Sequence, residues 1–252
     1  MRYFIYILFT LLISTSFISE AQILNVESLR KSSEDGIHGS IGLNFELKKE
    51  QLQQFSISSD AFLMYKKNKH RVLFKNVLQL QKIEGRDLSN NDVMHFRYGY
   101  KILDWLSYEA FTQGQFNKVS KIDLRALIGT GPRFKLTKTD KYKVYLGPLI
   151  MYEHQKLDQP ENPIENNIRA SIYLSFSLFP IENIAITHTT YYQPKIDYFK
   201  NFRLSSQTTA RFVIYKNINF QTNFQYTFDQ YPADDVPKSQ YNLNTGIVYQ
   251  FQ

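Results

Sequence analysis

The feature of this sequence that most constrains its fold is a strict alternation of aromatic or apolar residues with polar ones. The pattern is clearest over residues 96–133, where three alternating segments follow one another and only residues 103–105 separate the first two. Successive side chains of a β-strand point to opposite faces, so the pattern predicts strands with one aromatic and one polar face. The aromatic parity carries Phe96, Tyr98, Tyr100, Leu106, Tyr108 and Ala110, and the polar parity carries Arg97, Gly99, Lys101, Glu109, Gln113 and Gln115.

The same alternation recurs along the chain in twelve segments. They cover residues 38–48, 55–65, 71–81, the three within 96–133, 142–154, 168–178, 184–193, 202–215, 218–228 and 241–251. Alternation over ~10 residues between turns is typical of membrane-spanning strands, whereas strands of soluble sandwiches are usually about half that length. The polar faces also carry rows of Asn, Gln, Ser and Thr. We therefore predict an all-β, up-and-down transmembrane barrel of about twelve antiparallel strands, with ten strands as the alternative.

The connections between the segments support this interpretation. If the first connection is external, the internal turns are short, at 66–69, 103–105, 137–141, 180–183 and 216–217. The external connections are longer or richer in loop residues, at 84–92, 117–121, 157–167, 194–201 and 229–240. Short turns on one side and longer loops on the other are typical of outer-membrane barrels, in which an even strand number leaves both ends of the barrel in the periplasm.

The N-terminus has the pattern of a secretory signal. Arg2 precedes an apolar stretch at 3–17, and Ser19 to Ala21 form a small-x-small cleavage site. The sequence predicts a signal peptide at 1–21 that is cleaved after Ala21, a periplasmic N-terminal arm at 22–36, and a barrel at 37–252 in the outer membrane of a Gram-negative cell.

Composition narrows the function classes. The chain has no cysteine, so disulfide frameworks and thiolate metal sites are excluded. Its net charge of +7 is better explained by basic turns beside anionic lipid headgroups than by nucleic-acid binding. We expect no nucleic-acid partner and no cofactor. The expected partners are outer-membrane lipid, lipopolysaccharide and the barrel-insertion machinery, and we expect a monomer.

Several short aromatic-rich motifs resemble a known family. They are residues 97–100, Trp105, 108–111, Gln113, Arg125, 129–131, 151–154, Arg169, Ser171, Tyr173 and 192–194. Together they resemble the YdiY-like family of salt-induced outer-membrane proteins, the domain of unknown function 481, over roughly residues 36–251. The resemblance implies a porin-like outer-membrane barrel and brings no established substrate or catalytic residue. Many such barrels end on an aromatic residue, whereas here Gln252 follows Phe251.

The polar parity gathers charged residues in the predicted lumen. The candidate solute-contacting residues are Arg97, Lys101, Glu109, Arg125, Arg133, Glu153, Arg169, Arg203 and Arg211. In one interpretation Arg125, Arg169 and Arg211 pair with Glu109, Glu153 and Asp123 in a plug, because confined ions need partners. In the other, the cations line a passage that selects small anions.

An enzyme is the alternative function. Some twelve-stranded barrels modify lipids from the outer rim, but no Ser–His spacing in this sequence indicates a catalytic pair. A metal site at Glu153 and His154 is not expected, because adjacent strand residues point to opposite faces. We predict a structural barrel or a narrow passive channel with an Arg-rich lumen that favours small anions, and no catalytic or metal-binding residues.

Overall fold

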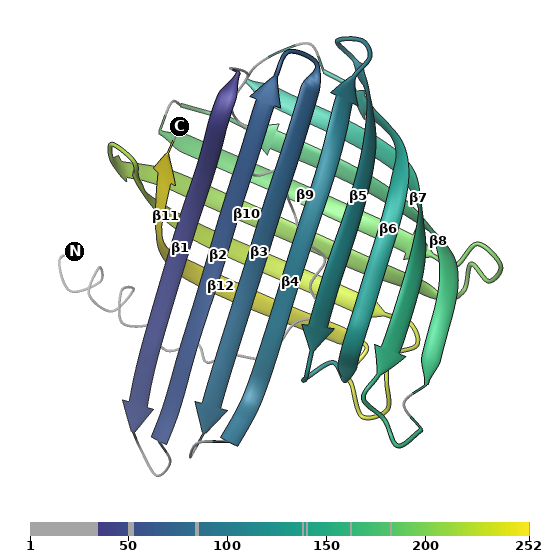
Figure 1. Ribbon diagram of the computed structural model, residues 1–252. Helices are drawn as coiled ribbons and strands as arrows, with labels where there is room; N and C mark the ends of the chain where they lie inside the picture. Colours follow the sequence, from purple (N-terminus) through teal and green to yellow (C-terminus); the bar gives the residue numbers. More distant parts are fainter. Residues whose placement is uncertain are drawn as a thin grey trace.

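The computed structural model of the protein describes residues 35–49, 53–83, 86–137, 139, 141–161, 163–181 and 183–251. The predicted signal peptide, and the predicted arm apart from Asp35 and Gly36, lie outside the described residues. Twelve strands form one closed antiparallel barrel, which confirms the predicted fold class and strand number (Figure 1). The strands are β1(Gly36–Lys49), β2(Gln53–Lys67), β3(His70–Ile83), β4(Arg86–Lys101), β5(Leu106–Asn117), β6(Ile122–Lys135), β7(Tyr142–Leu157), β8(Ile164–Leu178), β9(Ile184–Pro194), β10(Phe202–Tyr215), β11(Ile218–Asp229) and β12(Ser239–Phe251).

Each strand pairs with its neighbours in sequence, and β1 pairs with β12 to close the barrel. The connections therefore fall into two sets. We call one end of the barrel the loop end. It carries the connections after β1, β3, β5, β7, β9 and β11. The opposite end, which we call the turn end, carries the other connections, the start of β1 and the end of β12. The longest connection, residues 230–238, lies at the loop end. Among the described residues no helix is long and apolar enough to cross a membrane.

The two faces of the strands differ as the alternation predicts. In β5, Tyr108 is 47% exposed and the neighbouring Glu109 only 2%. In β8, Leu174 is 49% exposed on the outside while Ser175 is fully buried inside. The outer surface is therefore apolar and aromatic, and most polar side chains of the strands lie in the interior.

Two strand boundaries differ most from the prediction, while several others shift by one to three residues. The predicted external connection at 84–92 is mostly strand, because β4 begins at Arg86 and pairs with β3 from there. Likewise β8 begins at Ile164, so the connection predicted at 157–167 is shorter. The missed segments carry polar residues on both faces. Backbone pairing continues there without the alternation that a membrane-facing strand requires, so periodicity did not reveal them.

The prediction that Asp123 lies in the lumen is wrong because β6 contains an irregularity. The pairing of β6 with β7 shifts between Ile122 and Leu124. As a result Ile122 and Arg125 are buried while Asp123 and Leu124 are exposed, and Asp123 pairs with Lys156 at 2.5 Å on the surface. One extra residue in a strand reverses which parity faces inward.

The seam that closes the barrel is short. Among the described residues, β1 pairs with β12 only through residues 39–42 and 248–251, whereas it pairs with β2 along its whole length. The Phe251 ring lies so close to Gly39 that a Cβ on this glycine would be 2.2 Å from it. The glycine at position 39 thus lets Phe251, the last aromatic residue of the barrel, pack against the first strand.

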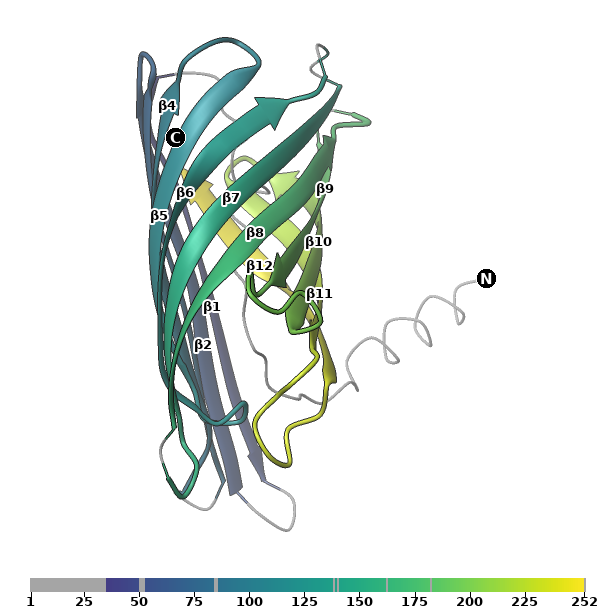
Figure 2. The ribbon, with the colours of Figure 1, turned by 90° about the vertical axis from the view of Figure 1, so that its right-hand side faces the viewer.

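The two sides of the barrel differ in height. Figure 2 shows the shorter β9–β12 wall opposite the tall wall of β4 and β5.

Arginine at position 174 tests which face meets lipid. The Leu174→Arg variant should lose about 2–4 kcal/mol of unfolding free energy in bilayers, because it places a charge in hydrocarbon. Urea titration of protein folded into lipid vesicles, followed by tryptophan fluorescence, measures the loss. The control is Ile181→Arg, which replaces a 59% exposed residue in the connection after β8 and should be nearly neutral. Equal stabilities of the two variants would contradict the assigned lipid face.

Candidate functional site

The barrel interior brings together eight of the nine candidate residues. Their exposed fractions are at most 8%: Arg97, Glu109, Arg125, Arg133, Glu153, Arg169, Arg203 and Arg211 are all buried. The exception is Lys101, which ends β4 at the turn end, is exposed, and contacts Asp104 at 2.6 Å. The pKa of the Asp104 carboxyl is lowered by the hydrogen bond and the positive charge of Lys101. Lys101 therefore belongs to a surface turn and not to the interior cluster.

Glu153 on β7 is the centre of the first charged cluster. Its side chain is fully buried, and Arg169 Nε lies 2.5 Å from one carboxylate oxygen while Arg125 Nε lies 3.2 Å from the other. The strand register explains both contacts. Glu153 pairs opposite Asn167 and Leu127, so Arg169 and Arg125 occupy the diagonal positions two residues further along the neighbouring strands. Diagonal neighbours are within reach of long side chains.

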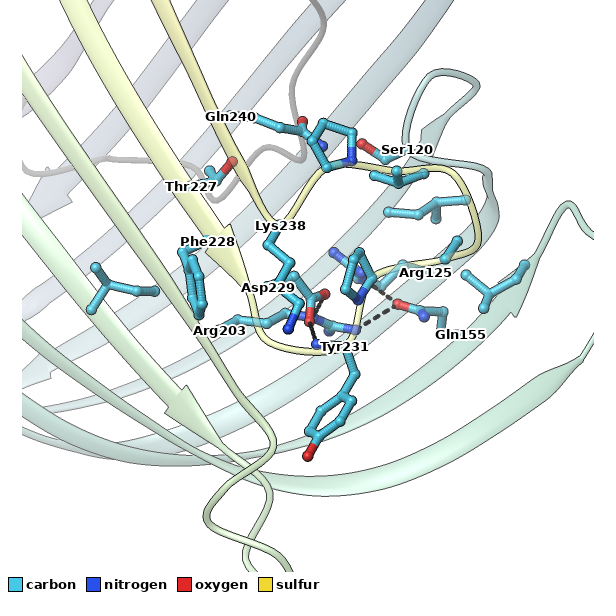
Figure 3. A pocket seen from close by; sticks show the side chains of 17 residues that line it. Ser120, Arg125, Gln155, Arg203, Thr227, Phe228, Asp229, Tyr231, Lys238 and Gln240 are labelled. Carbon is cyan, nitrogen blue, oxygen red and sulfur yellow. Dashed lines mark hydrogen bonds and ion pairs between the residues drawn. The ribbon is translucent and has the colours of Figure 1, made fainter.

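Arg203 joins this cluster from further round the barrel. Its Nη1 contacts Glu153 Oε1 on β7, although β8 and β9 lie between β7 and β10 in the sheet. Its Nε contacts Asp229 at 2.7 Å on β11, and its Nη2 donates to Gln155 at 3.1 Å (Figure 3). One guanidinium thus links three strands and lies beneath the longest loop.

Glu109 on β5 holds the second cluster. Arg97 Nη1 lies 3.2 Å from its carboxylate and Arg133 Nε lies 3.7 Å away, again from diagonal positions on β4 and β6. The Tyr173 hydroxyl on β8 donates to Glu109 at 3.1 Å across the interior. The Arg133 guanidinium also stacks on Tyr145, 3.5 Å from the ring centroid.

These contacts resemble a plug, but with different pairs from those predicted. Arg203, which was not among the predicted pairs, binds Glu153, whereas Asp123 pairs outside the barrel. Arg211 contacts no carboxylate of the described residues. Its Nη1 donates to the neutral Gln250 at 2.8 Å. Along the inner wall from β6 to β11, the four guanidinium groups of Arg125, Arg169, Arg203 and Arg211 contact only two carboxylates of the described residues, Glu153 and Asp229. The inner wall from β6 to β11 therefore carries excess positive charge.

Apolar side chains fill another part of the interior, which the sequence analysis missed. They are Phe111, Leu127, Leu149, Met151, Tyr173 and Tyr191. Glycines make room for the rings: a Cβ on Gly147 would be 2.1 Å from the Tyr173 ring and one on Gly129 would be 2.5 Å from Phe111. The glycines opposite large aromatic residues were the available signal, but it is readable only once the register is known.

Two small cavities lie among these side chains. One cavity of about 40 Å³ lies at the loop end, bounded by β6, β7, β10, β11 and the 230–238 loop. A second of about 20 Å³ lies between Arg97, Phe111 and Tyr191. A water molecule needs roughly 10–15 Å³ of such space, so these cavities hold a few waters at most. Charged and apolar side chains pack around both cavities.

The outer face carries a histidine–hydroxyl cluster on β9 and β10. His188 Nε2 lies 2.9 Å from Thr190 Oγ1 and 3.5 Å from Ser206 Oγ, and its Nδ1 lies 2.9 Å from Thr208 Oγ1. This resembles a base beside a nucleophile. However, His188 is the fifth of the eleven residues of β9, far from both rims, on a face flanked by Ile186 and Tyr192. A hydrolase needs water there, so the cluster does not support the rim-acting enzyme. Among the described residues no three metal-binding side chains cluster.

A closed twelve-stranded barrel with an apolar exterior and a charged interior defines an outer-membrane β-barrel protein. The NanC porin has the same fold, with a TM-score of 0.50, 8% identity, and coverage of 86% of this chain and 100% of that one. The translocator domain of autotransporter NalP from Neisseria meningitidis (TM-score 0.48, 9% identity, 85% and 87% covered) and the KdgM porin (0.44, 11%, 86% and 99%) are also similar. Among curated proteins, none matches the sequence.

The sequence of the chain matches the model of one protein family. The model of the family described as "Protein of unknown function, DUF481" matches residues 44–251. The chain belongs to this family, as its motifs predicted.

Removal of the Glu153 charge tests whether it holds the interior together. The Glu153→Gln variant should be destabilised by about 3–5 kcal/mol, because three buried arginines lose their shared partner. Urea unfolding of the folded barrel measures this loss. The control is Glu165→Gln on β8, whose carboxylate is 40% exposed and lies 3.9 Å from Lys195, and which should change stability by less than about 1 kcal/mol. A Glu153 variant as stable as this control would show that the cluster contributes nothing to folding.

Proposed function

We propose that this barrel is a narrow passive channel for small anions, which its own interior side chains close at rest. The observation that carries the proposal is the excess of guanidinium groups over carboxylates on the inner wall from β6 to β11. Burying a charge is expensive, and a plug that served only stability could use apolar residues instead. Rings of Arg and Lys in a pore favour anionic solutes.

Arg211 supports the proposal because its charge is least compensated. It is buried on β10, and among the described residues its only hydrogen-bond partner is the amide of Gln250. It lies toward the turn end of the strand. Arg125 and Arg203 lie toward the loop end. Guanidinium groups are therefore present at both ends of the interior, as a solute that crosses the barrel would require.

The Arg203–Asp229 pair connects the closed interior to the longest loop. Asp229 is the last residue of β11, immediately before the 230–238 loop, and its backbone N–H donates to Lys238 O at 2.9 Å. A movement of this loop would shift Asp229 and release Arg203 from one of its two carboxylate partners. We propose that this coupling opens the channel.

The usual orientation of such barrels places the loop end outside the cell and the turn end in the periplasm. In that setting outer-membrane lipid and lipopolysaccharide surround the apolar exterior. The protein is exported with cleavage after Ala21 and is folded by the barrel-insertion machinery. It acts as a monomer, without nucleic acid or cofactor.

Single-channel recording in planar bilayers under a salt gradient tests the proposal. Wild-type protein should give rare, small, anion-selective steps. Glu153→Gln should increase the open time, because the arginines then repel one another without a shared counter-ion. Arg211→Gln should reduce anion selectivity, while Lys101→Gln, which removes an exposed charge outside the cluster, should leave the selectivity unchanged.

Folding of each variant is checked by its heat-dependent shift in gel mobility. A folded wild-type protein and a folded Glu153 variant that are both silent would refute the channel and leave a structural barrel. Cation-selective steps would refute the role of the arginines.

A further inference from the structure

We propose that the cavity at the loop end binds the carboxylate or phosphate group of a small soluble anion, with Arg125 as its main ligand. Its role as the first binding station of the channel rests on the proposed function. Binding itself can be measured whether or not the barrel conducts.

The guanidinium group of Arg125 makes fewer hydrogen bonds than those of Arg169 and Arg203. Its Nε donates to Gln155 at 2.6 Å and faces Glu153 at 3.2 Å, but neither terminal nitrogen makes a hydrogen bond to any described residue. In contrast, all three nitrogens of Arg169 and all three of Arg203 contact acceptors. The Arg125 side chain is only 7% exposed and lines the cavity.

The unused edge of this guanidinium has a defined chemical preference. Two parallel N–H groups match the two oxygens of a carboxylate or phosphate and bind them in a bidentate manner. Because Glu153 and Gln155 fix the Nε side of the group, its orientation is set before a ligand arrives. The geometry therefore favours a planar or tetrahedral oxyanion over a neutral solute.

Two further polar atoms of the cavity wall lack partners. Ser120 Oγ and Gln240 Oε1 are both buried and make no hydrogen bond to the part of the chain that the structure describes. Buried polar atoms without partners are rare and costly, at about 1–3 kcal/mol each. The hydroxyl can donate to an anion, and the amide of Gln240, turned end for end, can present its N–H groups. Both atoms come from the rim of the same cavity as Arg125 (Figure 3).

The charge of the cavity is suited to an anion. Arg125, Arg203 and Lys238 line it against a single carboxylate, Asp229, which Arg203 contacts at 2.7 Å. Lys238 is exposed at the end of the loop and makes no ion pair with a described residue. A bound oxyanion would gain from Arg125 and Lys238 without competing for Asp229.

The 230–238 loop lines the cavity, and two contacts between exposed side chains join it to neighbouring loops. Lys121 contacts Asp235 at 3.2 Å, and the hydroxyls of Tyr198 and Tyr231 lie 3.2 Å apart. Exposed pairs of this kind contribute at most about 1 kcal/mol each. The cavity of about 40 Å³ accommodates one oxyanion group, so a larger solute would enter with its anionic end first as the loop lifts.

Isothermal titration of inorganic phosphate into the detergent-folded, lipopolysaccharide-free barrel tests the inference. Arg125→Gln should weaken phosphate binding at least tenfold. Arg125→Lys should keep only part of the wild-type affinity, because lysine retains the charge but lacks the two parallel N–H groups. Lys238→Gln, at an exposed position that should not affect folding, should weaken binding several-fold. The matched control Lys101→Gln, at the opposite end of the barrel, should bind as wild type. Higher ionic strength should weaken wild-type binding.

Folded Arg125 and Lys238 variants that bind phosphate as wild type does would overturn the inference, as would a wild-type protein that binds no phosphate. The other source of the same chemistry is a lipid headgroup. If added lipopolysaccharide binds in an Arg125-dependent manner and phosphate does not displace it, the site recognises lipid headgroups and the soluble-anion assignment is wrong. Binding without conductance would refute the channel alone, and anion-selective conductance without binding would refute this site alone.

Discussion

The interior of this barrel depends on one buried carboxylate, Glu153, shared by three arginines. Ionised groups cannot remain buried without partners, and here the partners come from β6, β8 and β10. The bond from Arg203 joins strands that are not neighbours in the sheet, so it fixes the interior as well as the wall. Because Arg203 also holds Asp229, the position of the longest loop is coupled to the same carboxylate.

This arrangement follows from strand geometry. Alternation puts Glu153 and the arginines on the inner face, and the register places Arg125 and Arg169 at diagonal positions beside Glu153. The resulting layer carries more guanidinium groups than the carboxylates they contact. The excess positive charge faces the interior, and the unused edge of Arg125 and the 230–238 loop border the same cavity at the loop end. The closed channel that we propose, with an anion site at its mouth, accounts for these three features together.

Much of the fold could be predicted from the sequence because lipid demands one apolar face on every strand. The twelve strands and the inward position of Glu109, Glu153 and most of the arginines follow from period-two patterning alone. Asp123 was misplaced because a single extra residue in β6 reverses the parity. Lys101 was misplaced because its strand ends there, and a terminal residue can turn to the surface. The specific partners, such as Arg203 with Glu153, depend on contacts between distant strands, which no local pattern encodes.

A double-mutant cycle between Glu153 and Arg203 tests the central claim most directly. The unfolding free energies of wild type, Glu153→Gln, Arg203→Gln and the double variant would be measured by urea titration in lipid vesicles. If this pair holds the interior, its coupling energy should lie in the upper part of the about 0.5–3 kcal/mol range found for contacting residues. A coupling energy near zero, with all four proteins folded, would contradict the account, because the two groups would then contribute to the barrel independently.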